Sequence, residues 1–136
     1  MTNHGEAGTL EEAKAGLVDA FQRWSVWAGV GQADGKGPVE PRWVLTKDEL
    51  PPGHGMLKTT CDPESDWLLM SGGFVAGREH RPAGGPKHDP HWGLLTSGPM
   101  AGGVVWSGGW AESIDAAKEH LLAAWQAWLR WAELAA

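Results

Sequence analysis

Residues 67–78 read Trp67-Leu-Leu-Met-Ser-Gly-Gly-Phe-Val-Ala-Gly-Arg78, and this stretch decides the fold. Two short apolar runs flank Gly72 and Gly73, and adjacent glycines supply the backbone freedom that tight turns between strands require. The pattern predicts either a single bent strand or a β-hairpin with a glycine turn.

The flanking sequence extends this unit in both directions. Further strands are expected at 92–96 and 104–107, giving an antiparallel β-meander over residues 66–107. Short strands and loops are expected over residues 42–60, with strand candidates at 42–46 and 55–60. A helical turn is expected from Thr46 to Leu50, where Pro51 and Pro52 would stop it.

Two amphipathic helices are expected at the ends of the chain, over residues 9–28 and 113–134. Aligned at an offset of 104, they share eight of 20 residues, which indicates either a duplicated helix or two helices patterned for the same task. Thr9 and Ser113 are suitable N-caps. The apolar stripes are broad and need a cover, most simply a sheet. We therefore expect one α+β domain over residues 1–136, an antiparallel β-meander of three or more strands with the N- and C-terminal helices packed on one face.

Composition and charge limit the setting of the protein. The chain has 136 residues, 42% of them hydrophobic, and a net charge of -6, which suits one globular domain. No apolar run approaches the roughly 20 residues of a membrane span, and the first residues lack the basic start of a secretory signal. Cys61 is the only cysteine, so an internal disulfide cannot form. We expect a cytoplasmic protein that does not enter membranes.

The most polar segment lies between two expected strands, at residues 78–91. Cationic and imidazole side chains there could bind a phosphate, a carboxylate or an acidic partner, and the same residues suit an ordinary solvated loop. His88 and His91 lie three residues apart, and His80 could face them across the hairpin, as imidazole ligands of zinc, nickel or copper would. Pro90 rules out regular helical spacing, so no metal ligands are assigned. The candidate binding residues are Arg78, His80, Arg81, Lys87, His88 and His91.

Catalytic and cofactor motifs are missing from the sequence. There is no Gly-x-Ser-x-Gly elbow and no phosphate-binding glycine loop. Acidic neighbours of Cys61 would raise the pKa of its thiol and weaken it as a nucleophile. The balance therefore favours a non-enzyme, with no catalytic residues and no cofactor.

The helix start Ser113-Ile-Asp-Ala-Ala-Lys-Glu-His-Leu-Leu122, placed after a meander, superficially resembles the arm-binding domains of tyrosine recombinases over about residues 66–125. That resemblance implies DNA readout by basic residues on the sheet. The expected strand cores at 67–75, 92–96 and 104–107 contain no Lys or Arg, and the chain is acidic. Because affinity for nucleic acid depends on cations, nucleic acid is a disfavoured partner.

Trp92-Gly-Leu-Leu95, the Gly98-Pro99 turn and the Ala- and Trp-rich last helix resemble small uncharacterised proteins of GC-rich proteobacteria and their phages or mobile elements. This resemblance implies no activity. We expect a non-enzymatic, small acidic protein-binding module that contacts another protein or a second copy of itself. A narrower hypothesis is a phage or mobile-element inhibitor of a host defence nuclease, such as an anti-CRISPR, whose acidic charge occupies a basic groove. The alternatives are a nucleic-acid-binding module and a metal- or anion-dependent activity of the 78–91 loop.

Overall fold

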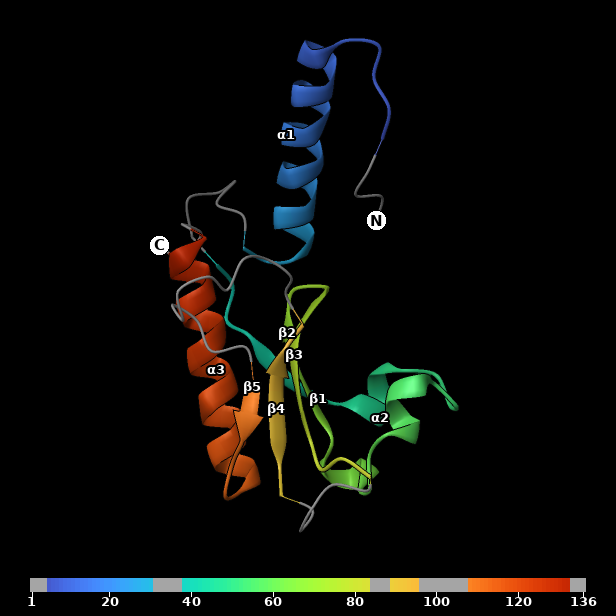
Figure 1. Cartoon of the computed structure of the whole chain (residues 1–136), viewed down its shortest axis with the longest axis vertical. Helices are drawn as coiled ribbons and strands as arrows, with labels where there is room; N and C mark the ends of the chain where they lie inside the picture. Colours follow the sequence, from blue (N-terminus) through green and yellow to red (C-terminus); the bar gives the residue numbers. More distant parts are fainter. Residues whose placement is uncertain (1–4, 31–37, 84–88, 96–107, 133–136) are drawn as a thin grey trace.

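The computed structural model describes residues 5–30, 38–83, 89–95 and 108–132. Their architecture is α+β, as predicted, with an antiparallel sheet in the order β1-β2-β3-β4-β5 and a long helix towards each end of the chain (Figure 1). The elements are α1 (Leu10–Trp27), β1 (Arg42–Leu45), α2 (Thr46–Glu49), the 3-10 helices η1 (Gly55–Lys58) and η2 (Pro63–Ser65), β2 (Trp67–Ser71), β3 (Phe74–His80), β4 (His91–Leu94), β5 (Gly108–Trp110) and α3 (Ile114–Trp131).

The glycine pair at 72–73 forms the turn of a β2–β3 hairpin. Gly72 has φ +55°, and a Cβ atom there would lie 2.5 Å from the carbonyl oxygen of Trp27. The N–H of Gly73 donates to that same oxygen at 2.8 Å. A glycine pair is therefore needed both for the turn and for the close approach of the end of α1.

The other expected strands have mixed outcomes. The strand expected at 92–96 is β4, and the helical turn expected after Thr46 is α2. The strand candidate at 55–60 is wrong: η1 occupies it, because the His54 side chain accepts the N–H of Met56 and caps a helical turn. The strand expected at 104–107 lies outside the described residues, and β5 occupies residues 108–110, for which no strand is predicted.

Helix α3 covers one face of the sheet. The hydroxyl of Ser113 accepts the N–H of Ala116 and caps the helix, as predicted. A Cβ atom on Gly77 of β3 would lie 2.4 Å from a methyl group of Leu121, so α3 packs very closely at this point. The buried side of α3 consists of Ala117, Leu121, Ala124, Trp125, Trp128 and Leu129. These side chains form the core with residues of the sheet.

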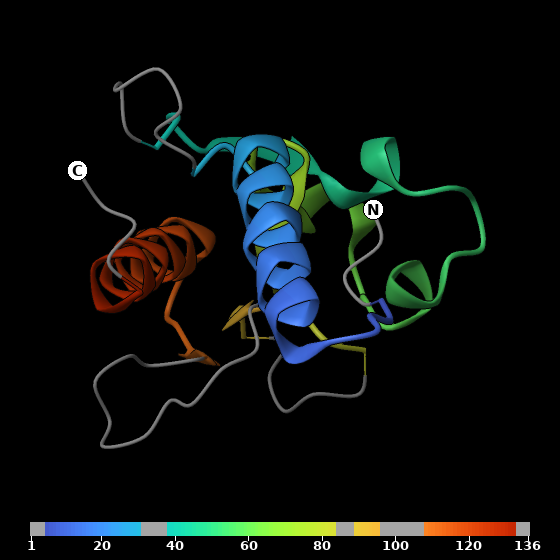
Figure 2. The same ribbon diagram turned by 90° about the horizontal axis from the view of Figure 1, so that it is seen from above.

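Helix α1 is capped by Thr9, as predicted, and ends at Trp27, with Ala28 as its C-cap and Gly29, which has φ +67°, directly after the cap. Its C-terminal end is anchored in the core, where Ala28 and Val30 are fully buried. The rest of the helix rises past the β2–β3 turn and away from the sheet (Figures 1 and 2). The expectation that both helices pack on one face of the sheet is therefore confirmed for α3 and wrong for α1. Helix α3 occupies that face, and α1 contacts the rest of the fold at its C-terminal end. Within the described residues, no helix is both long and apolar enough to cross a bilayer.

Candidate functional site

Strand β3 distributes the residues of the predicted polar segment between the two faces of the sheet. Successive side chains of a strand point to opposite faces. Gly77 faces α3, so Glu79 shares that face, whereas Arg78 and His80 lie on the other one. The second face is partly covered by the segment that carries α2, η1 and η2 (Figure 1).

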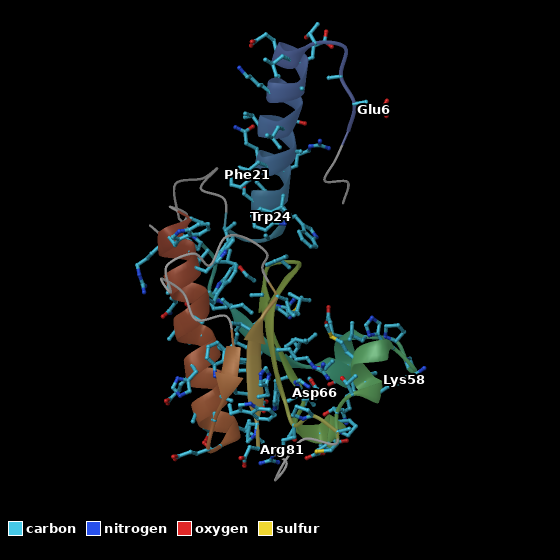
Figure 3. The ribbon with its side chains drawn as sticks, viewed as in Figure 1. Glu6, Phe21, Trp24, Lys58, Asp66 and Arg81 are labelled. Atoms are coloured by element: carbon cyan, nitrogen blue, oxygen red, sulfur yellow. The ribbon has the colours of Figure 1, made fainter. Side chains whose placement is uncertain are left out.

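Arg78 is held by an internal ion pair. Its Nε and Nη2 atoms donate to the two carboxylate oxygens of Asp66 at 3.0 and 2.7 Å, and Asp66 is fully buried. Further donations go to the Met56 carbonyl and the Thr59 hydroxyl, while the Thr46 hydroxyl donates to Asp66 at 2.6 Å. Figure 3 shows Asp66 between the sheet and this covering segment. The guanidinium charge is thus neutralised internally, and Arg78 ties that segment to β3.

His80, His91 and Trp110 form a row across β3, β4 and β5. His80 pairs with His91 in register, and His91 pairs with Trp110. The ring centroids lie 6.3 Å apart for the two histidines and 4.9 Å apart for His91 and Trp110. Burial, with the Arg78 charge adding to it, lowers the pKa of His80 to about 4, and burial also lowers the pKa of His91. Both imidazoles are therefore neutral at pH 7.

Neutral imidazoles can ligate a metal ion, but the row holds too few ligands. Among the described residues, no group of three or more His, Cys, Asp or Glu side chains is arranged to hold a metal ion. Lys87 and His88 lie outside the described residues. Arg81 follows β3, and its carbonyl accepts the N–H of Cys61 at 2.9 Å. The structure thus brings His80 and His91 together, and it separates Arg78 from them by engaging it with Asp66.

Glu79 is a buried acid that the sequence analysis did not identify. It is fully buried on the α3 side of the sheet, paired in register with Trp67 and Trp92, and neither carboxyl oxygen has a hydrogen-bond partner among the described residues. Burial raises the pKa of its carboxyl to about 8, against the opposing effect of Lys118. The Lys118 Nζ lies 3.6 Å from the Trp67 ring centroid. Side chains alternate between the two faces of a sheet along a strand, so placing Arg78 on one face would have placed Glu79 on the other, the face that α3 covers.

The described surface with the most apolar exposure lies on α1. We call Leu10, Ala13, Leu17, Phe21 and Trp24 the α1 stripe; these residues recur at helical spacing along one side of the helix. Leu10 is 68% exposed, Leu17 70% and Phe21 50%. A hollow of about 460 Å³ borders the stripe, between residues 5–7 and the small side chains of the helix.

The α1 stripe is continuous with the core at its lower end. Phe21 stacks on Trp24 with centroids 6.0 Å apart, Trp24 meets Phe74 edge-on at 5.4 Å, and Phe74 lies 6.0 Å from Trp125 of α3. Figure 3 shows Phe21 and Trp24 at the lower half of α1, above the sheet. A chain of aromatic contacts therefore leads from the buried core to the exposed part of the stripe.

The tryptophans divide between the core and the surface. Trp125 and Trp128 are buried in the core, whereas Trp27 is 45% exposed, Trp110 53% and Trp131 41%. Trp27 borders the α1 stripe at its anchored end. The exposed part of Trp27 thus enlarges the apolar surface of the α1 stripe.

Comparison of the chain with protein-family models, with curated proteins and with solved structures found no match.

Proposed function

We propose that this protein is a small, acidic, non-enzymatic protein-binding module of the cytoplasm, and that α1 is its recognition element. The observation that carries the proposal is the exposure of the α1 stripe. Leu121 of α3 is fully buried, while Leu17, the residue that matches it in the repeated helical pattern, is 70% exposed. An isolated apolar helix face of this extent is typical of a protein interaction site.

The charge distribution supports a protein partner over a nucleic acid. Arg78, the best-placed cation of the polar segment, is neutralised by Asp66, and the whole chain carries a net charge of -6. A phosphate backbone would meet net repulsion. The narrower hypothesis, an inhibitor of a host defence nuclease from a phage or mobile element, predicts that the partner is a nuclease with a basic groove.

The proposal is tested by affinity capture with a tagged copy of the chain from host lysate that also contains an untagged copy, with nuclease treatment to remove nucleic acid. The wild type is compared with Leu17→Glu, which places a charge on the α1 stripe, and with Ala15→Glu, which places the same charge on the opposite, exposed side of the helix. We expect a stoichiometric protein, retained after nuclease treatment by the wild type and by Ala15→Glu and lost with Leu17→Glu. Retention that nuclease abolishes, or that Leu17→Glu leaves unchanged, would refute α1 as the protein-binding element.

A further inference from the structure

The α1 stripe matches itself when two copies of the helix run antiparallel. Its large members are Leu10, Leu17, Phe21 and Trp24, and Ala13 is small. If the helices cross at Leu17, Leu10 of one copy lies beside Trp24 of the other, and Phe21 lies beside the small Ala13. Leu17 then meets its own equivalent at the two-fold axis. Phe21 thus faces the small Ala13 on either side of the centre, which lets the helices approach closely, and Leu10 packs against the ring of Trp24 at the ends of the pair.

The exposed area is sufficient for a pair of this kind. Leu10, Leu17 and Phe21 of the α1 stripe are between 50% and 70% exposed, and Val18 and Trp27, one on each flank of the stripe, are 57% and 45% exposed. Such side chains contribute on the order of 100 Å² each, so two copies would bury roughly 600 Å² through the stripe and at most about 1,000 Å² with both flanks, which is the lower limit of specific interfaces. An α1 pair can therefore reach the size of a specific interface when the flanking side chains are covered with the stripe.

The position of α1 in the fold also allows the pair to form. Among residues 5–30, 38–83, 89–95 and 108–132, the contacts of α1 with the core lie at its C-terminal end, and the remainder of the helix rises away from the sheet (Figures 1 and 2). An antiparallel partner would carry its own sheet at the far end, so the two bodies would sit at opposite ends of the helix pair. Antiparallel order also sets the two helix dipoles in opposite directions, which is favourable.

We infer that the partner of the α1 stripe is a second copy of this chain, bound through antiparallel α1–α1 pairing centred on Leu17. The inference rests on the proposed function, since it names the partner of the same surface. The α1 pair would join the two cores, because the aromatic contacts from Phe21 to Trp24 and Phe74 continue into each protomer.

Light scattering during size-exclusion chromatography tests the pairing with purified protein. We expect the wild type and Ala15→Glu to have twice the mass of one chain at micromolar concentration. Leu17→Glu, which buries two like charges at the centre of the pair, should weaken the dimer at least about 100-fold and elute as a monomer. A monomeric wild type at 100 µM would overturn the inference. If lysate capture still depended on Leu17 in that case, the proposed function would stand and only the second copy would be excluded.

Cysteine cross-linking tests the antiparallel order, in a Cys61→Ser background that removes the exposed native thiol. Leu17→Cys should form a disulfide-linked dimer under mild oxidation, whereas Ala15→Cys should not. A mixture of Ala13→Cys and Phe21→Cys chains should cross-link to each other. A self-linked Leu10→Cys dimer, with no product from that mixture, would show parallel pairing and overturn the inferred geometry.

Discussion

Arg78 and Asp66 form a bidentate ion pair in the interior of the molecule. Two guanidinium nitrogens of Arg78 donate to the two carboxylate oxygens of Asp66 at 3.0 and 2.7 Å, and the side chains are 10% and 0% exposed. The pair joins the middle of the sheet to the residue that precedes β2. Because Arg78 also donates to the Met56 carbonyl, η1 depends on the same contact.

Arg78→Ala should therefore destabilise the protein strongly. Removing one partner of a buried pair leaves Asp66 as an uncompensated buried charge, which costs about 3–5 kcal/mol. Arg81→Ala is the matched control, and it should cost less than about 1 kcal/mol because no described ion pair involves its side chain. The free energy of unfolding from urea denaturation measures both. Small, equal losses would show that Arg78 contributes little to the fold and would restore it as a candidate anion ligand.

Local patterns in the sequence predict the parts of the fold whose causes are local. The turn at Gly72 and Gly73 needs a glycine because Gly72 has φ +55°, and Thr9 and Ser113 each accept the N–H group three residues later. Each feature depends on residues close together in the chain. These elements are therefore where the predictions agree with the structure.

Features set by distant contacts could not be predicted in the same way. Leu17 and Leu121 occupy equivalent positions in a repeated pattern, yet one is exposed and the other buried. Periodicity shows that a helix face is apolar and says nothing of what covers it. In the same way, the sequence pattern predicts that Arg78 binds a ligand together with His80 and Arg81. Its ion pair with Asp66 depends on the register of β2 and β3, which the sequence does not fix.

Glu79→Gln should stabilise the protein at neutral and alkaline pH. The pKa of Glu79 is about 8 in the folded chain, against an ordinary value of 4.5. Between these values the folded state holds a proton that the unfolded state has lost. The free energy of unfolding of the wild type, compared with that of Glu79→Gln, is therefore highest below pH 4.5 and decreases as the pH rises to 8. The total loss is on the order of a few kcal/mol.

Urea denaturation from pH 4.5 to 8.5 measures this difference. Glu119→Gln, on the exposed side of α3, is the control and should follow the wild type across the range. If the wild type and Glu79→Gln keep parallel pH profiles, the Glu79 carboxyl has an ordinary pKa and is not buried as described.

Trp128→Ala should cost about 3–5 kcal/mol of unfolding free energy. The Trp128 side chain is 8% exposed and stacks on Trp125 with centroids 5.2 Å apart, so truncation leaves a large cavity in the core. Trp131→Ala, one turn later and 41% exposed, should cost about 1 kcal/mol or less. Thermal unfolding at one protein concentration compares the two variants. A negligible loss for Trp128→Ala would move this residue from the core to an interface.

Gly72→Ala should weaken the attachment of α1 to the sheet. Gly72 has φ +55°, and the new methyl group would lie 2.5 Å from the Trp27 carbonyl oxygen and 2.8 Å from the Gly29 nitrogen. Gly53→Ala is a matched control, because Gly53 also has a positive φ, +82°, with no atom within 4 Å of the added carbon. The backbone cost should be about 1 kcal/mol at both sites. The clash should add a further 1–3 kcal/mol at Gly72 alone. Urea denaturation gives the difference between the two variants, and equal losses would mean that the turn does not hold the end of α1.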